Sequence, residues 1–414
     1  MEKLQTKNLL NKKCLITGEP VTKILSFGMH PYADTFVSKD QLSLTEPTLP
    51  LDVYLNELSG QIQLGYISHD YERYSLYSYS YTSSNSKFAR DHWDAYYKKL
   101  KELFNTENSL VVEVGSNDGY LSQHFLKDNN KVLGVDPSAE MCKLAADRGI
   151  DIYNTLFSKA AADTISKKYG NAKLIVANNV FNHSNNPVDF AEGVADLLTK
   201  DGVFVFELPY WGSTVESGRF DQIYHEHVSY FTMKSAYSLL SKVGLKITDF
   251  EIVDYHGGSL RVYSTKDENA TTSPKVFEMI KKETEQGLFD VETYAKWQKT
   301  LAQKRNEFLK HLYTLKVAKP DVSIIGVGAA AKANTFLNYY NIDSTVLDYV
   351  TDSSPHKQGK YTPLTRIPIV GDEIFETYKE VYALVLSWNI SDSLKTILLK
   401  INPNIKFITQ DESN

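Results

Sequence analysis

The stretch LVVEVGSNDGYL, residues 110–121, predicts how the centre of this chain folds. Its apolar residues lead directly into the turn Gly115-Ser-Asn-Asp-Gly119, as a buried parallel strand does where it passes into a helix. A second apolar segment, residues 131–135, ends in Asp136, about 20 residues after the first glycine. An acid in that position can accept hydrogen bonds from a ribose diol. The sequence therefore predicts a nucleoside site at this turn.

The form of the turn predicts which nucleoside binds. It reads E-x-G-S-N-D-G, and it lacks the glycine that lets a G-x-G-x-x-G turn approach a pyrophosphate. A nucleoside without phosphates beside the loop fits better, which favours S-adenosylmethionine (SAM). We expect contacts to SAM from Gly115, Ser116, Asn117 and Asp136, with Gly115 leaving room for the ligand. The alternative is an ordinary strand, turn and helix with no ligand.

Composition restricts the class of protein. The 414 residues are enough for two or three domains, and the net charge of −6 offers no basic face for nucleic acid. The sequence contains no apolar stretch of membrane-spanning length and no apolar segment near its start. With two cysteines, it has no disulfide framework. We expect a soluble cytoplasmic protein that binds neither nucleic acid nor membrane.

Four zones follow one another along the chain. Residues 1–70 are strand-like and rich in turns, whereas residues 86–265 alternate short apolar strands with helix-length segments, which is typical of a doubly wound parallel sheet. Residues 275–316 have apolar side chains at spacings of three, four and seven, which predicts a packed amphipathic helical linker. From Val322 onward strands and helices alternate again. The sequence thus predicts an α/β protein with a second, smaller α/β domain.

The second α/β segment contains its own glycine loop. Residues 326–331 read G-x-G-x-x-A after an apolar strand, and Asp348 is at a suitable distance for a ribose, so a nicotinamide dinucleotide is one possible ligand. Lys332, Asn334 and Thr335 begin the following helix, where polar groups can meet an anion such as a diphosphate. Lys357 and Lys360, in the next turn, either add to this site or belong to a solvated loop.

Tyr224-His225-Glu226-His227 is the other concentration of chemical groups. In a strand the two histidines would share one face, and in a turn all four side chains could converge. A zinc site would need further ligands, and a buried structural histidine pair is the simplest alternative. We favour general acid–base chemistry, because histidine has the ordinary pKa best suited to proton abstraction near neutral pH.

Taken together, these motifs resemble the SAM-dependent C-methyltransferases that act on nucleotide-linked 4-keto-deoxyhexoses. The resemblance spans nearly the whole chain and implies a zinc-binding domain over residues 1–75, a SAM domain over 76–265 and a Rossmann-like domain over 266–414. The matching pieces are EVGSNDGYL, NNVFNH (178–183), YHEHVSYF (224–231), GGSLRVY (257–263), GVGAAAKANTFLNYY (326–340), SSPHKQGKYTP (353–363) and WN (388–389).

The chain departs from the family at its zinc site. The family has two C-x-x-C-G knuckles, which here read Cys14-Leu-Ile-Thr17-Gly18 and Asn56-Glu-Leu-Ser59-Gly60. Thr, Asn and Ser cannot replace thiolate ligands of structural zinc. We therefore expect this domain to fold through packing and to bind no zinc.

The resemblance also implies a reaction and a set of site residues. The carbon next to the ketone loses a proton, and the resulting enolate takes the methyl group of SAM. By similarity His227 is the base, Tyr224 and His225 position the enolate, and Glu226 orients a histidine. The remaining implied contacts are Asn178 or Asn179 with SAM, the tyrosines Tyr77, Tyr79 and Tyr81 over cofactor and sugar, and Lys332, Asn334 and Lys357 with a nucleotide diphosphate between the two α/β domains. Arg261 is either a further anion contact or a structural pair partner.

Three alternatives remain at this point. One is a methyltransferase that acts on a sugar oxygen or nitrogen and needs no enolate. Another is a nicotinamide enzyme that uses the loop at Gly326. The third is a sugar-nucleotide-binding protein without activity. The sequence predicts no oligomeric state.

Overall fold

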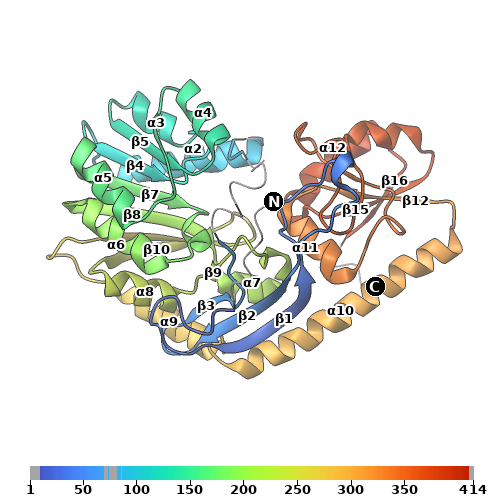
Figure 1. Ribbon diagram of the computed structural model, residues 1–414, viewed down its shortest axis with the longest axis horizontal. Coiled ribbons are helices and arrows are strands. Elements are labelled where there is room, and N and C mark those ends of the chain that lie inside the picture. Colours follow the sequence, from blue (N-terminus) through green and yellow to red (C-terminus); the bar gives the residue numbers. More distant parts are fainter. Residues whose placement is uncertain (1–9, 70–72, 74–81, 85, 410–414) are drawn as a thin grey trace.

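The computed structural model describes residues 10–69, 73, 82–84 and 86–409. Within these residues the chain forms one four-stranded, one seven-stranded and one five-stranded sheet (Figure 1). Tyr77, Tyr79 and Tyr81, predicted to lie over the ligands, are outside the described residues.

The four-stranded sheet is antiparallel and has the order β1-β2-β3-β9. Its strands are β1 (Thr22–His30), β2 (Leu49–Asn56), β3 (Gln61–Leu64) and β9 (Ser229–Tyr230), with the short helix η1 (Lys39–Gln41) between β1 and β2. The last strand comes from beyond residue 75. The N-terminal segment therefore completes its sheet with residues next to the Tyr224–His227 turn.

The seven-stranded sheet has the order β10-β11-β8-β7-β4-β5-β6. The strands from β8 to β6 run parallel, and β11 and β10 add an antiparallel edge. Their bounds are β4 (Leu110–Val114), β5 (Lys131–Asp136), β6 (Asp151–Asn154), β7 (Ala172–Asn178), β8 (Leu198–Pro209), β10 (Lys246–Val253) and β11 (Ser259–Thr265). The predicted doubly wound sheet is confirmed.

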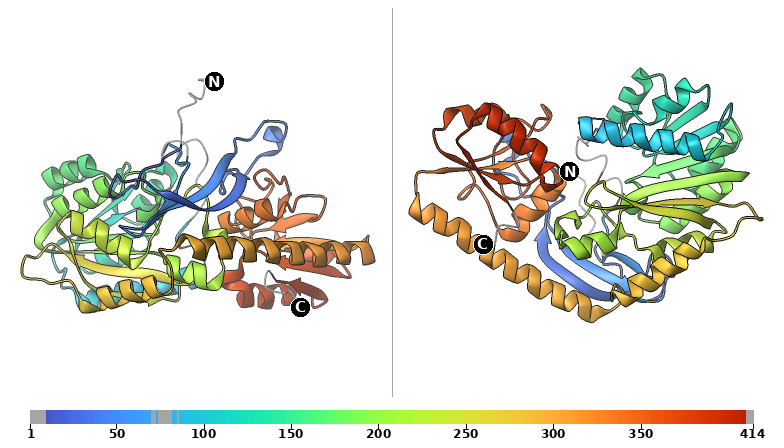
Figure 2. Two further views of the ribbon diagram at one scale, coloured as in Figure 1. Left: turned by 90° about the horizontal axis from the view of Figure 1, so that it is seen from below. Right: turned by 180° about the vertical axis from the view of Figure 1, so that it is seen from behind.

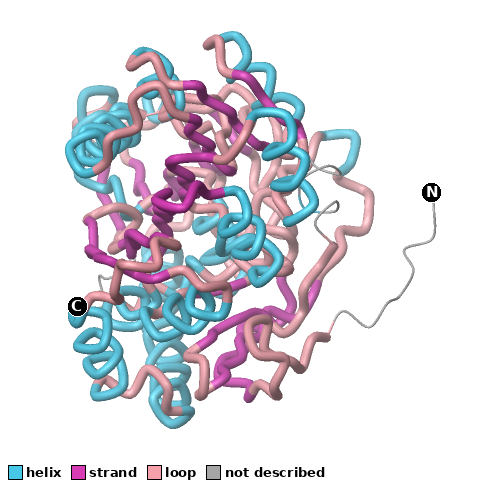
Figure 3. Tube along the Cα trace, turned by 90° about the vertical axis from the view of Figure 1, so that its left-hand side faces the viewer, coloured by secondary structure: helices cyan, strands magenta, loops and turns pink. Residues whose placement is uncertain are grey.

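Helices cover both faces of this sheet (Figure 3). One face packs against α2 (Lys87–Leu103), α3 (Ser122–Lys127) and α4 (Ala139–Asp147), and the other against α5 (Lys159–Tyr169), α6 (Pro187–Leu197) and α8 (Met233–Lys242). Side chains that accept from the first turn mark where several helices begin, as Ser138 does for α4 and Thr232 for α8. The short helix α7 (Trp211–Ser217) follows β8.

The predicted helical linker consists of two helices, α9 (Pro274–Glu285) and α10 (Val291–Ala318). The Asp290 side chain accepts from the backbone N–H of Glu292 and begins α10. Of the apolar positions that set this period, Tyr294, Trp297, Leu301, Phe308 and Leu312 are buried, and Leu315 is half-buried against the same cluster. Figures 1 and 2 show α10 running along both the N-terminal sheet and the C-terminal unit.

The five-stranded sheet is parallel throughout and has the order β14-β13-β12-β15-β16. Its elements are β12 (Ser323–Val327), α11 (Ala331–Tyr340), β13 (Tyr349–Thr351), β14 (Ile369–Val370), η4 (Asp372–Thr377), β15 (Val381–Val385), η5 (Trp388–Ile390), α12 (Ser391–Ile401) and β16 (Ile405–Ile408). The second α/β unit is therefore present as predicted.

One hydrophobic cluster connects the N-terminal sheet, the helix that follows β8 and the C-terminal unit. It contains side chains of β1, β2, α7, α10, α11 and β12, among them Phe27, Trp211, Phe308 and Phe336. The indole N–H of Trp211 donates to the hydroxyl of Tyr294 at 2.8 Å inside this cluster. Among the helices described, none is both long and apolar enough to cross a bilayer.

Candidate active site

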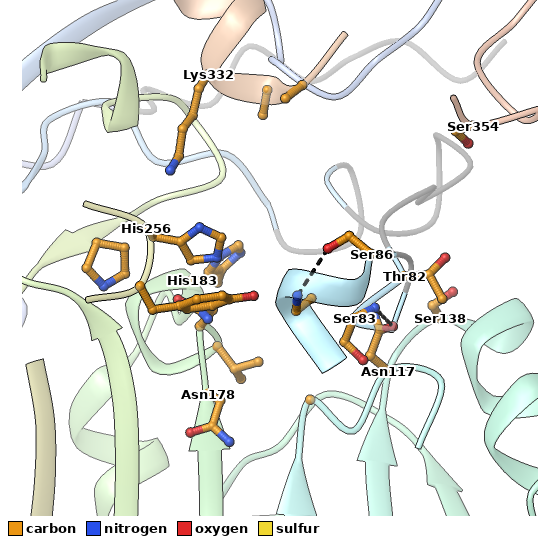
Figure 4. A pocket seen from close by; sticks show the side chains of 18 of the residues that line it. Thr82, Ser83, Ser86, Asn117, Ser138, Asn178, His183, His256, Lys332 and Ser354 are labelled. Carbon is orange, nitrogen blue, oxygen red and sulfur yellow. Dashed lines mark hydrogen bonds between the residues drawn. The ribbon is translucent and has the colours of Figure 1, made fainter. Parts of the chain in front are cut away.

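A cavity of about 660 Å³ lies between the two α/β units, a size typical of small-molecule sites. It is lined by the loops that follow β4, β5 and β7 on one side and β12, β13 and β15 on the other (Figure 4). Open α/β sheets bind ligands outside the carboxyl ends of their parallel strands. Here two such edges face one cavity.

Asp136 closes the predicted nucleoside turn. Its Oδ2 accepts from the backbone N–H of Asn117 and its Oδ1 from that of Ser138, both at 2.9 Å. The carboxyl group is 6% exposed and lines the cavity, and its burial raises its pKa. Each oxygen retains a lone pair that a ribose hydroxyl can use.

Gly115 is required for a different reason from the one predicted. Its φ of +68° favours glycine, and a Cβ there would lie 2.0 Å from Cγ2 of Val180. The space beside Gly115 is thus filled by a side chain that follows β7 and not by the ligand. Gly115 still lines the cavity through its backbone.

Several polar atoms at this end lack hydrogen-bond partners. Nδ2 and Oδ1 of Asn178 and Oγ of Ser116 are buried without a partner among the described residues, and Asn178 is one of the lining residues drawn in Figure 4. Asn179 lines the same wall, where its N–H donates to the carbonyl of Glu207 at 2.7 Å. A buried polar group without a partner is costly, so these atoms fit a polar ligand such as SAM.

Glu113, at the end of β4, is a buried carboxyl group in the cavity wall. Its Oε2 accepts from the hydroxyl of Ser122 at 2.5 Å. Burial raises the pKa of Glu113 to about 8. The group is therefore mostly neutral at pH 7.

Tyr224 and His227 form a hydrogen-bonded pair in the cavity wall. The residues lie in a turn, with the N–H of His227 donating to the carbonyl of Tyr224 at 2.9 Å. Nδ1 of His227 is 2.9 Å from the carbonyl of Gln222, which only accepts, so Nδ1 carries the proton. Nε2 then accepts from the Tyr224 hydroxyl at 2.7 Å. Burial, aided by the charge of Lys332, lowers the pKa of His227 to about 3 and keeps the ring neutral.

The other two residues of the turn lie away from the cavity. Nε2 of His225 is 3.2 Å from the carbonyl of Leu49, and Oε1 of Glu226 accepts from the N–H of Asp34 at 3.1 Å. Burial lowers the pKa of His225 to about 4 and raises that of Glu226 to about 7. The turn therefore does not bring all four side chains together. Glu226 was expected to orient a histidine, but its carboxylate contacts the N-terminal segment.

Two histidines that the sequence analysis did not select complete this wall. The ring centroid of His183, in η2 (Phe181–His183), is 4.9 Å from that of His227, and His256 also lines the cavity. Burial holds the pKa of both well below the ordinary range. Their signals were the motif NNVFNH, which ends in His183, and the position of His256 directly before GGSLR.

The C-terminal wall carries Lys332 and Lys357. Nζ of Lys357 donates to the carbonyl of Ala329 at 2.8 Å, whereas Nζ of Lys332 has no hydrogen-bond partner among the described residues. Asn334 does not line the cavity. The residue is fully buried, and its Nδ2 donates to the carbonyl of Ala33 at 2.6 Å. The predicted contact of Asn334 with a phosphate is therefore wrong.

Asp348 is also misplaced by the sequence analysis. It precedes β13 and therefore lies at the end of the strand away from the cavity. Asp352 occupies the expected position: its Oδ2 accepts from the N–H of Ala329 at 3.0 Å and its Oδ1 from that of Ser354 at 2.9 Å. This arrangement repeats that of Asp136 in the other unit.

Arg261 is a structural partner. Its Nε and a terminal nitrogen lie 2.7 and 2.6 Å from Oε2 of the fully buried Glu207, and the other terminal nitrogen is 3.0 Å from Glu251. The guanidinium also stacks 4.2 Å from the ring centroid of Tyr96. It is not among the described residues that line the cavity, so its use as an anion contact is excluded.

Three of the four knuckle positions, Cys14, Asn56 and Ser59, meet in the N-terminal segment. Sγ of Cys14 is 3.4 Å from Oγ of Ser59, and that hydroxyl donates to Oδ1 of Asn56 at 2.8 Å. Hydrogen bonds thus connect positions that hold thiolates in the resembled family. The absence of zinc stays a prediction.

The chain is similar in sequence to known methyltransferases over most of its length. A family model described as a methyltransferase domain matches residues 88–249, and one described as the C-methyltransferase C-terminal domain matches residues 254–409. The C-methyltransferase NovU of Streptomyces niveus is 29% identical over 390 residues, which cover 92% of this chain and 91% of that protein. These matches define a SAM-dependent methyltransferase. Together they support a SAM-dependent C-methyltransferase family for this chain.

Part of the chain is also similar to solved structures. Magnesium protoporphyrin IX methyltransferase from Synechocystis PCC 6803, solved with SAM bound, is 13% identical, with 43% of this chain and 79% of that chain covered and a TM-score of 0.34. A possible SAM-dependent methyltransferase from Listeria monocytogenes is 15% identical, with 42% and 98% covered and a TM-score of 0.35. Likeness at these scores does not bear on the substrate.

Replacing Glu113 with Gln should flatten the pH dependence of stability. The folded-state pKa of about 8 exceeds the ordinary value of 4.5, so the folded chain holds a proton that the unfolded chain loses. The wild type therefore loses free energy of unfolding as the pH rises from 4.5 to 8, by at most about 1.4 kcal/mol per pH unit. From pH 5 to 9 the thermal midpoint of Glu113→Gln should rise relative to that of the wild type. The midpoint of Glu107→Gln, which changes an exposed carboxylate, should keep a constant difference from the wild type. A constant difference across this range would contradict the assignment.

Proposed function

We propose that this protein transfers the methyl group of SAM to the carbon next to the ketone of a nucleotide-linked 4-keto-deoxysugar. The observation that carries the proposal is the Tyr224–His227 pair, which faces the same cavity as the unpartnered amide of Asn178. A proton acceptor and a polar cofactor wall on one cavity are what enolate formation and methylation require. The whole-length likeness to a C-methyltransferase supports the same reaction.

The cofactor would lie along the loops after β4, β5 and β7. Asp136 would accept from the ribose hydroxyls, and Asn178 and Ser116 would pair with polar atoms of the cofactor. Gly115 and Asn117 would contact it through the turn, with Asn179 beside Asn178. When bound, SAM supplies an electrophilic methyl group on a sulfonium that leaves as neutral S-adenosylhomocysteine.

The Tyr224–His227 pair would remove the proton. Nε2 of His227 accepts the proton, either directly after the Tyr224 hydroxyl rotates away or through that hydroxyl, which passes its own proton to Nε2. The low pKa of His227 keeps Nε2 available, and the enolate formed beside the ring stabilises the imidazolium by opposite charge. His225 and Glu226 have no part in this step because both contact the N-terminal segment.

The nucleotide diphosphate would lie against the C-terminal wall. Lys357 is held beside the loop after β12 by the carbonyl of Ala329, and the loop after β13 adds the hydroxyl groups of Ser353 and Ser354. This places the charged part of the substrate opposite the cofactor loops. The sugar would then extend toward Tyr224 and His227.

Calorimetric titration with S-adenosylhomocysteine tests the cofactor site. We expect Asp136→Ala to weaken binding by at least about tenfold, because hydrogen bonds to a carboxylate contribute about 1.5–3 kcal/mol. Asp352→Ala is the matched control, since Asp352 closes the corresponding turn of the other unit. It should retain wild-type affinity. Loss of affinity in Asp352→Ala alone would move the cofactor to the C-terminal unit.

Exchange of the substrate C–H in D2O tests the base. With nucleotide-linked 4-keto-6-deoxyhexoses and no SAM, we expect the wild type to exchange the hydrogen next to the ketone. His227→Gln should slow this exchange by about 10²–10⁴, the usual contribution of a general base. His225→Gln, in the same turn but pointing away from the cavity, keeps a donor for the carbonyl of Leu49 and should stay close to the wild-type rate. The reverse order of the two variants would contradict the assignment.

A further inference from the structure

Lys332 is a buried cation in the cavity wall. Neither the proposed base nor the proposed cofactor contacts give it a role. It is the second residue of α11, and its Nζ is shielded from solvent without a hydrogen-bond partner among the described residues. An ammonium group in that state has lost the water that solvates it and gained no acceptor in return. Such a group fits a ligand that brings an anionic oxygen.

The surroundings of Lys332 hold its ammonium in place. Nζ lies 5.1 Å from the ring centroid of Trp388, whose indole N–H donates to Oδ2 of Asp221 at 2.5 Å. Asp221 is buried, and its charge favours the protonated form of Lys332, whereas Arg219 opposes it. Burial lowers the pKa of Lys332 to about 8, so the group is mostly charged at neutral pH.

The ammonium lies on the histidine side of the cavity. Figure 4 shows Lys332 reaching from α11 toward His256 and His183, while Ser354, in the loop that carries Lys357, lies on the other side of the view. The charge of Lys332 lowers the pKa of both His227 and His256, which places it within electrostatic reach of the proposed base. Nζ of Lys357 lies 2.8 Å from the carbonyl of Ala329 and 3.5 Å from Oδ2 of Asp352, so the two lysines of this wall have different surroundings.

We propose that Lys332 is a catalytic residue whose ammonium donates a hydrogen bond to the ketone oxygen as that oxygen becomes the enolate. The inference rests on the proposed function and revises the expectation that Lys332 binds the diphosphate, which belongs with Lys357. The C–H bond next to the ketone breaks, its proton goes to the Tyr224–His227 pair, and its electrons form the C=C bond while the carbonyl electrons move to oxygen. That oxygen is neutralised by Lys332, so the charge develops beside a cation that is already in position.

The influence of Lys332 on the pKa of His227 allows two roles of Lys332 to be distinguished: hydrogen bonding to the enolate oxygen and an indirect effect through the base. The charge of Lys332 lowers the basicity of His227, so removing it makes His227 a stronger base. If Lys332 acted only through the base, its removal would speed proton abstraction. Slower abstraction after its removal therefore reports the lost stabilisation of the enolate.

The test compares Lys332→Met with Lys357→Met in two measurements. Solvent exchange of the C–H next to the ketone, without SAM, should fall by about 10²–10³ in Lys332→Met, as it does when one oxyanion donor is removed. Calorimetric affinity for thymidine diphosphate and uridine diphosphate, which lack the sugar, should stay within about twofold. Lys357→Met should show the opposite pattern, with affinity for the nucleoside diphosphates lowered and the exchange rate at saturating substrate preserved.

Controls separate the possible failures. Binding of S-adenosylhomocysteine at wild-type affinity shows that Lys332→Met is folded, and Lys332→Arg, which keeps the charge, should recover part of the exchange. Unchanged or faster exchange in Lys332→Met overturns the role of Lys332 alone. If Lys332→Met loses nucleoside diphosphate affinity and exchange rate to the same extent, Lys332 binds the diphosphate and not the ketone oxygen. Absence of exchange in the wild type overturns the proposed function and this inference with it.

Discussion

The ring of Phe220 is the contact on which the geometry of the cavity depends. It stacks on Phe27 of β1 at 5.6 Å between centroids and packs on Tyr339 and Tyr340 of α11 at 4.8 and 6.1 Å. Phe220 begins η3 (Phe220–Gln222), whose last carbonyl fixes the proton of His227 on Nδ1. One buried ring thus ties the helix that carries Lys332 to the turn that carries the proposed base. The distance between the two walls is set by packing, which is rigid at interior densities.

The N-terminal sheet holds the Tyr224–His227 turn in position. β3 pairs with β9, directly after the Tyr224–His227 turn, and that turn is also held by the contact of His225 with the carbonyl of Leu49. The two side chains of the turn that face away from the cavity therefore fix the two that face it. This gives the N-terminal segment a structural purpose at the site, and the hydrogen bonds between the knuckle positions Cys14, Ser59 and Asn56 add to the packing of that segment.

The sequence predicted the features that depend on local pattern. The strand before Gly115, the position of Asp136 and the buried face of α10 all follow from periodicity or from short spacing, and all three agree with the structure. Apart from Asp348, which directly precedes β13 where a residue following that strand was needed, the errors concern contacts between distant segments. Asn334 is paired with Ala33, which lies 301 residues away, and the space beside Gly115 is filled by Val180. Arg261 and Glu207 are likewise paired across neighbouring strands, β11 and β8.

The central claim is that the methyl group reaches carbon. The most direct measurement is NMR of the product formed from a nucleotide-linked 4-keto-6-deoxyhexose and SAM labelled with ¹³C in its methyl group. If the sugar carbon is also labelled, a methyl carbon bonded to carbon gives one-bond carbon–carbon coupling to the position next to the ketone, and this is the result expected. A labelled methyl group attached to oxygen or nitrogen, without that coupling, would contradict the account and would leave Tyr224, His227 and Lys332 without their assigned roles.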